Sequence, residues 1–214
     1  MAPAAPLHRE VTGIVLAGGL SRRMGGGDKG LRELAGKPML AHVLDRLRPQ
    51  VGRLAINANG DPARFAAFGV PVVPDTIEGF VGPLAGVLAG MRWSAAHAPR
   101  ARWIATAAGD APLLPADLVA RLMAAVGDNS IALAQSNGDL HPVIGLWPVA
   151  LADDLEAQLR AGVRKVLAWT DRHGTTAVAF PPQRIGDASV DPFFNANTPE
   201  ELDGLRAMLV RAAP

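Results

Sequence analysis

The stretch that decides the fold is Val11-Thr12-Gly13-Ile14-Val15-Leu16-Ala17-Gly18-Gly19, near the start of the chain. Its first seven residues are almost continuously apolar, and its last two are glycines. A short apolar run without polar alternation is typical of a strand buried on both faces, as in a parallel sheet. Glycines at its end let the backbone approach a ligand closely. The stretch therefore predicts a buried strand of an α/β fold, followed by a loop with a possible binding role.

The rest of the chain alternates between strand and helix patterns. Strands are predicted at 54–57, 70–73, 103–108, 131–134 and 143–147, and helices at 149–160, 163–171 and after Pro38, Pro83, Pro115 and Thr198. The last helix begins with a capping-box pattern. This alternation predicts an α/β fold: a single-domain, three-layer, Rossmann-like open sheet, mostly parallel, with helices on both faces. We expect residues 1–10 to form a flexible tail and 11–214 to form one domain.

Composition indicates a globular protein and excludes several function classes. Of the 214 residues, 49% are hydrophobic and 19% are charged, a balance typical of a folded domain. The formal net charge of +1 gives no electrostatic basis for binding nucleic acid or a membrane surface. No apolar run is long enough to cross a bilayer, and the N-terminus lacks a signal-peptide pattern, so a cytoplasmic protein is expected. Without cysteine, a disulfide framework, a thiolate metal site and a cysteine nucleophile are excluded.

The loop after the first strand combines six glycines, between Gly18 and Gly30, with the cations Arg22, Arg23 and Lys29. Glycines alone would fit an ordinary solvated loop, but amides that face an anion together with three cations favour phosphate binding. The spacing from Gly25 to Gly30 matches a dinucleotide fingerprint, yet it lies several residues past the strand and opens no helix. Lys29 also lacks the neighbours of a P-loop lysine. The sequence therefore predicts a triphosphate-binding loop of another type.

A carboxylate follows the apolar run at 103–108. Asp110, after Gly109, is expected at the sheet edge that also carries Gly18 and Asn57, because ligands of open α/β sheets lie beyond the carboxyl ends of the strands. Mg²⁺ in nucleotide sites is held by one or two carboxylates together with phosphate oxygens and water. The alternative is an acid that only stabilises a helix N-terminus. Given the basic loop, we predict Mg²⁺ as the cofactor and Asp110 as its ligand.

These motifs resemble a known signature. Leu16-Ala17-Gly18-Gly19, Ser21-Arg22-Arg23-Met24-Gly25 and Asp28-Lys29-Gly30 are similar to the pattern of the nucleotidyltransferases related to molybdenum cofactor guanylyltransferase. Cytidylyltransferase relatives typically have alanine at the position of Gly18, so the glycine pair resembles the GTP-using branch. The resemblance implies that Arg23, Lys29 and Asp110 are catalytic. It further implies a nucleotide-binding set of Leu16, Ala17, Gly18, Gly19, Arg23, Lys29, Asn57, Asp75, Gly86 and Asp110.

Three members of that set also have plain structural interpretations. Without the resemblance, Asn57 fits a residue at the end of a strand, and Asp75 fits a proline-linked turn. Gly86 follows Gly82-Pro83, which fits an ordinary helix start. As a ligand residue, Asp75 would accept a hydrogen bond from a guanine amino group or from a ribose hydroxyl, and the sequence does not choose between them.

A second motif, Asn195-Ala196-Asn197, stands where related cytidylyltransferases and sugar-nucleotide enzymes have two aspartates. The neutral pair resembles the guanylyl branch, in which these asparagines lie near the pterin substrate, and it removes charge from a second metal site. Arg164 and Lys165 resemble basic residues that meet a terminal phosphate, although a solvated pair is equally compatible. The implied pterin-binding set is therefore Arg164, Lys165, Asn195 and Asn197.

The resemblance covers about residues 11–211 and implies one reaction. GMP is transferred from Mg-GTP to the terminal phosphate of molybdopterin, or of its molybdenum-bound form, and pyrophosphate leaves. GTP and molybdopterin are the implied partners. Other proteins of molybdenum cofactor biosynthesis and recipient apoenzymes are further candidates, and neither nucleic acid nor membrane is expected. The alternatives are a cytidylyl- or sugar-phosphate nucleotidyltransferase of the same fold, and a nucleotide or cofactor carrier without turnover.

Overall fold

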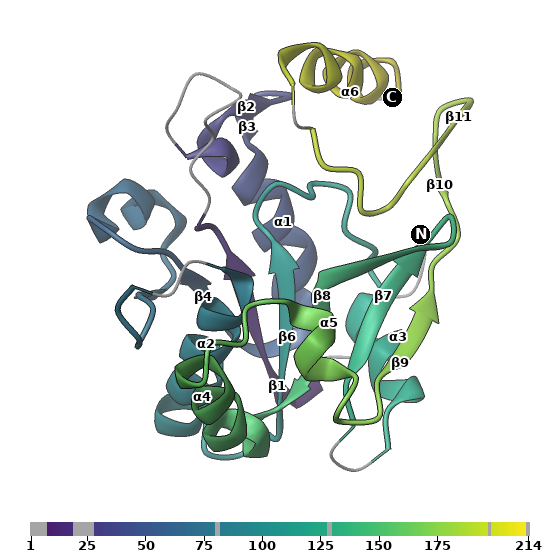
Figure 1. The fold of residues 1–214 in the computed structure, drawn as a ribbon. Helices are drawn as coiled ribbons and strands as arrows, with labels where there is room; N and C mark the ends of the chain where they lie inside the picture. The colour runs from purple at the N-terminus through teal and green to yellow at the C-terminus, as the bar shows by residue number, and fades with distance from the viewer. Residues whose placement is uncertain (1–7, 19–27, 80–81, 128–129, 197, 213–214) are drawn as a thin grey trace.

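One seven-stranded sheet organises the chain (Figure 1), in a computed structural model that describes residues 8–18, 28–79, 82–127, 130–196 and 198–212. The strand order is β5-β4-β1-β6-β8-β7-β9. All neighbouring pairs are parallel except those that β8 makes with β6 and β7, which confirms an open, mostly parallel sheet. The strands are β1 (His8–Leu16), β4 (Val51–Asn57), β5 (Val72–Val73), β6 (Trp103–Ala108), β7 (Ala132–Ser136), β8 (Asp139–Pro148) and β9 (Thr176–Ala179).

The first strand is longer than its apolar run predicts. β1 begins at His8, which pairs with Val51 of β4. The carbonyl oxygen of Glu10 accepts a hydrogen bond from the backbone N–H of Arg102 at 2.9 Å. Residues 8–10, which the sequence assigns to a flexible tail, therefore belong to the sheet. The polar side chains of these residues gave no sign of a strand in the sequence. Strand pairing uses backbone groups, so polar residues can take part in it.

Helices cover both faces of the sheet (Figure 1). α1 (Met39–Leu47) and α3 (Leu118–Ala125) pack on one face, whereas α2 (Pro83–His97), α4 (Ala152–Arg160) and α5 (Val166–Thr170) pack on the other. Val11 and Val15 of β1 contribute to the first face, and Ile14 contributes to the second. Because β1 is covered by apolar side chains on both faces, its sequence is an almost continuous apolar run. Helices on both faces of the sheet confirm the predicted three layers.

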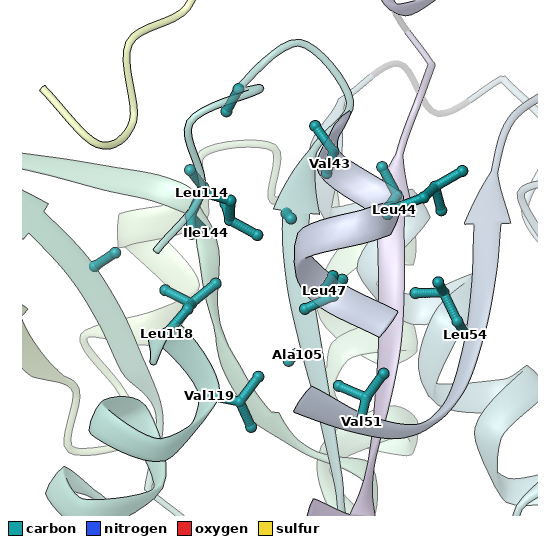
Figure 2. Packing of buried hydrophobic residues seen from close by; sticks show 14 of the residues in the cluster. Val43, Leu44, Leu47, Val51, Leu54, Ala105, Leu114, Leu118, Val119 and Ile144 are labelled. Atoms are coloured by element: carbon teal, nitrogen blue, oxygen red, sulfur yellow. The ribbon is translucent and has the colours of Figure 1, made fainter. Parts of the chain in front are cut away.

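Aliphatic side chains fill the space between the sheet and the first pair of helices (Figure 2). Leu44 and Leu47 of α1 lie close to Leu54 of β4, and Leu118 of α3 lies near Ile144 of β8. Each of these side chains is at most 8% exposed. Since burial of one such side chain is worth about 1.5–3 kcal/mol, this packing fixes α1 and the turns that lead into it.

Several short elements surround the sheet. They include two hairpins, β2–β3 (Glu33–Leu34 and Lys37–Pro38) and β10–β11 (Gln183–Ile185 and Ala188–Val190), and the 3-10 helices η2 (Lys29–Leu31), η3 (Arg48–Gln50), η4 (Pro62–Phe68) and η5 (Val149–Leu151). The last helix, α6 (Pro199–Ala212), begins with the predicted capping box: Thr198 and Glu201 exchange two backbone-to-side-chain hydrogen bonds of 3.2 Å. Among the described helices, none has the length and hydropathy to span a membrane.

Candidate functional site

The carboxyl ends of three adjacent strands form one edge of the site. Leu16 of β1 is in register with Asn57 of β4 on one side and with Ala108 of β6 on the other. The backbone N–H of Ala17 donates to the carbonyl oxygen of Asn57, and that of Gly109 donates to the carbonyl oxygen of Leu16, both at 2.9 Å. Sheet pairing thus continues just past the strands and places Ala17, which directly precedes Gly18, between Asn57 and Gly109. This confirms the predicted convergence at one edge.

A lysine joins this edge to distant parts of the chain. Lys29, in the short helix η2, donates from Nζ to Oδ2 of Asp110 at 2.7 Å and also to Oδ1 of Asn195. The Lys29 and Asp110 side chains are only 14% and 21% exposed. At Gly30, a Cβ would stand 3.0 Å from the carbonyl oxygen of Gly109, so glycine lets η2 approach the end of β6. Three residues predicted from separate motifs therefore meet in one cluster.

The cluster of Lys29, Asp110 and Asn195 contains the predicted Mg²⁺ ligand. Asp110 offers one carboxylate, Asn195 adds an amide oxygen, and a cationic group of the protein already lies between the two oxygens. In the part of the chain that the structure describes, no group of three His, Cys, Asp or Glu side chains is placed to hold a metal ion. One carboxylate is enough for Mg²⁺ when phosphate oxygens and water supply the other ligands. The residues present fit a Mg²⁺ that arrives with a triphosphate.

An aspartate held by two amides lies on the other side of β1. Asn57 donates from Nδ2 to Oδ1 of Asp75 at 3.0 Å and to the carbonyl oxygen of Val73 at 3.1 Å. Asn59 donates to Oδ2 of Asp75 at 2.8 Å and accepts from the Asp75 backbone N–H at 2.9 Å. Asn57 is buried and Asp75 half-buried. Both carboxylate oxygens are therefore fixed, and each keeps acceptor capacity for a further donor.

A glycine allows α2 to reach this pair. A Cβ on Gly86, in the first turn of α2, would stand 2.3 Å from Oδ1 of Asn57. No side chain fits there unless Asn57 moves. Gly86 is thus required by the close approach of helix and strand end, and this physical reason was not visible from the helix-start motif alone.

The remaining predicted residues are placed differently. Arg164 is exposed and donates to the carbonyl oxygens of Leu159 and Val163, and exposed Lys165 directly precedes α5. The Arg164 carbonyl oxygen lies 3.9 Å from where a Cβ of Gly82 would stand, so this loop borders the start of α2. Gly19, Arg23 and Asn197 lie outside the described residues.

Sequence reasoning missed a polar cluster that supports Asn195. Asp191 accepts from the Ser136 hydroxyl at 2.8 Å and from the Phe193 backbone N–H at 2.8 Å. Because Ser136 gives its only proton to Asp191, its oxygen accepts from Nε2–H of His141 at 2.7 Å. Burial lowers the pKa of His141, although Asp191 and Asp139 act in the opposite direction. This cluster anchors the turn at residues 191–194, which directly precedes Asn195, and no motif in the sequence pointed to it.

Arg64 and Asn59 were also missed. Arg64 donates to Asp28, which directly precedes Lys29, and to the backbone of Asn59. An arginine in a short 3-10 helix has no periodic or motif signal. Asn59, two residues after Asn57, carried a weak signal because it also follows the end of β4.

Known proteins share both the sequence and the fold. The chain matches the family described as MobA-like NTP transferase domain over residues 13–176. Molybdenum cofactor guanylyltransferase of Rhodopseudomonas palustris is 55% identical over 198 residues, which are 91% of this chain and 92% of that protein.

Two solved structures show how widely the fold is shared. Molybdopterin-guanine dinucleotide biosynthesis protein A of Archaeoglobus fulgidus has a TM-score of 0.70 at 21% identity, covering 94% of this chain and 99% of that one. The 4-diphosphocytidyl-2C-methyl-D-erythritolsynthase of Anaerococcus prevotii also has a TM-score of 0.70, at 13% identity, covering 95% and 97%. The fold therefore accommodates different nucleotidyl reactions, and the sequence match is more specific. By that match, the chain belongs to the MobA-like NTP transferase family, and within it to the molybdenum cofactor guanylyltransferases.

Proposed function

We propose that this chain transfers GMP from Mg-GTP to the terminal phosphate of molybdopterin, releases pyrophosphate and forms the guanine dinucleotide of the cofactor. The observation that carries the proposal is the meeting of Lys29, Asp110 and Asn195 at the carboxyl edge of the sheet. It combines a phosphate-binding cation, a metal-binding carboxylate and a neutral amide on the acceptor side. Family membership supports the identity of the two substrates.

The transfer requires no strong general base. The terminal phosphate of molybdopterin is ionised at neutral pH, so one of its oxygens attacks the α-phosphorus of GTP in line. The new O–Pα bond forms as the bond between Pα and the bridging oxygen breaks, and pyrophosphate leaves with that electron pair. Positioning and neutralisation of charge supply the catalysis.

Each charged residue has a proposed task in that step. Lys29, together with Arg23, holds the triphosphate and stabilises the negative charge that grows on the departing pyrophosphate. Asp110 would hold Mg²⁺, which, when bound, neutralises further phosphate charge. Backbone amides near Leu16, Ala17, Gly18 and Gly19 cradle the nucleotide. Asn195, with Asn197, Arg164 and Lys165, orients the pterin substrate.

Recognition of the nucleoside is assigned to the pair of Asn57 and Asp75. A carboxylate whose two oxygens are fixed by amides is a preorganised acceptor, suited to a guanine amino group or a ribose hydroxyl. The fold alone does not select the base, because a structure named for a cytidyl product matches as well as one named for a guanine dinucleotide. The guanine preference rests on the sequence relatives.

Three further assignments stay predictions. We propose that the sheet and its helices, from His8 onward, act as one nucleotidyltransferase domain in the cytoplasm. Other proteins of molybdenum cofactor biosynthesis and recipient apoenzymes are its candidate protein partners. Neither nucleic acid nor a membrane has a role in the proposed reaction.

The direct test is pyrophosphate release with each of the four nucleoside triphosphates, in the presence of Mg²⁺ and molybdopterin. We expect release with GTP that depends on molybdopterin, and little release with CTP, ATP or UTP. Consumption of CTP in place of GTP would support a cytidylyltransferase. Binding of GTP without any release of pyrophosphate would support a carrier.

A further inference from the structure

Arg64 connects two segments that border the proposed nucleotide site. Its guanidinium donates from Nη1 to Oδ2 of Asp28 at 2.5 Å and from Nη2 to the carbonyl oxygen of Asn59 at 2.5 Å. Its Nε donates to the carbonyl oxygen of Asp61 at 2.9 Å. One planar fork thus holds the end of the glycine-rich loop and the loop that follows β4.

The element that carries Arg64 is itself well anchored. η4 begins with Asp61, whose side chain accepts from the backbone N–H of Ala63 at 2.9 Å, and ends at Gly69 with a φ of 62°. Phe65, the neighbour of Arg64, is only 1% exposed and belongs to the same core cluster as the buried residues of α1 and β4. The guanidinium lies 5.0 Å from the centroid of the Phe65 ring. Arg64 therefore projects from a fixed base, which reduces the entropy lost when its fork engages.

The two ends of this bridge matter for different parts of the ligand. Asp28 directly precedes Lys29, the cation proposed to hold the triphosphate. Asn59 holds Asp75, the acceptor proposed for the nucleoside. The Asp28 side chain is 16% exposed, so its charge is poorly solvated and lies one residue from a phosphate-binding position. Arg64 supplies the compensating charge, without which Asp28 would repel the triphosphate.

We propose that Arg64 is a positioning residue for the nucleoside triphosphate. It acts through Asp28 and Asn59, and it fixes the separation between the phosphate-binding turn and the nucleoside-binding carboxylate. The proposal rests on the proposed function in one respect, namely that the ligand of this edge is a nucleoside triphosphate.

The test is a double-mutant cycle of R64Q, D28N and the combined variant, with steady-state pyrophosphate release as the readout. We expect R64Q to lower kcat/KM by about 10- to 100-fold, mainly through a higher KM for the nucleotide. The reason is that displacement of the turn at Asp28 and Lys29 weakens binding of the triphosphate. R64K should restore little, since an ammonium does not reproduce the fork. The double variant should be no worse than R64Q within about twofold, because both changes break the same link.

A matched control is Arg121, which makes the same kinds of contact elsewhere. It lies 3.9 Å from Asp117, donates to the carbonyl oxygen of Ala179 at 2.6 Å and stacks 4.6 Å from the centroid of Phe180. Its side chain is 38% exposed, against 35% for Arg64. R121Q should show any general loss of stability in thermal unfolding but keep the wild-type KM.

Two results would overturn the proposal. The first is a wild-type kcat/KM for R64Q, measured on a variant whose unfolding temperature equals that of the R121Q control. The second is a double variant in which the losses of R64Q and D28N multiply, which would mean that Arg64 does not act through Asp28. All variants are measured with the nucleotide that the wild-type chain consumes. A preference for CTP would therefore refute the guanylyl assignment, but the effect of R64Q could still be compared with the wild type.

Discussion

At the scale of single residues, Gly86 shows how a backbone position sets the shape of the site. Any Cβ there would stand 2.3 Å from Oδ1 of Asn57, well inside contact distance. We expect Gly86→Ala to displace Asn57 from Asp75, to cost about 1–3 kcal/mol of stability through overpacking, and to raise the KM for GTP. Urea unfolding and pyrophosphate release measure the two effects.

The control for this substitution is Gly204→Ala in α6. A Cβ at Gly204 has nothing within 4 Å, and alanine is favoured over glycine inside a helix by about 0.5–1 kcal/mol. It should be neutral or stabilising and keep the wild-type KM. A Gly86→Ala variant that behaved in the same way would show that Asn57 is not held as described.

At the scale of elements, the sequence predicted those whose side chains face an apolar core. β6 and α2 begin where their patterns begin, and α6 has its capping box. The sequence did not reveal the edge strand β9 or the hairpin β10–β11, none of whose residues is buried and which carry no apolar periodicity. The antiparallel direction of β8 also escaped, because strand direction is set by the connection and not by the strand's own residues.

In the candidate site, too, some residues could be predicted from the sequence and others could not. Lys29 and Asp110 could be predicted because they belong to compact motifs, one in the loop after β1 and one at the end of β6. Asn57 was identified only through the family resemblance. Arg64 and Asp191 could not, since they act on residues 36 and 55 positions away and have no local signal. Motifs thus identified the residues proposed to meet the ligand, whereas the residues that hold them required the tertiary structure.

At the scale of the whole molecule, two half-buried histidines predict how stability depends on pH. Burial is the largest cause that lowers the pKa of both His42 and His141. Their folded-state pKa values therefore lie below the unfolded value of about 6.5, so the unfolded chain binds protons first as the pH falls. We expect the free energy of unfolding to decrease below about pH 6.5.

Urea unfolding at pH 7.5, 6.5 and 5.5 and constant ionic strength tests this expectation. His141→Gln and His42→Gln should each reduce the loss of stability between the first and last pH. A chain that became more stable as the pH fell through this window, or variants that kept the full dependence, would refute the assignment of the effect to these histidines.

The central claim is that η2, β6 and the turn before α6 form one transfer site around Lys29. It is tested most directly by the rate of pyrophosphate release at saturating Mg-GTP and molybdopterin in Lys29→Met, which keeps the aliphatic stem and removes the charge. Arg48→Ala is the control, because Arg48 is exposed at the C-terminal end of α1, opposite the end that follows η2. The account predicts a rate at least about 100-fold lower for Lys29→Met and a wild-type rate for Arg48→Ala. A folded Lys29→Met chain with the wild-type rate would contradict it.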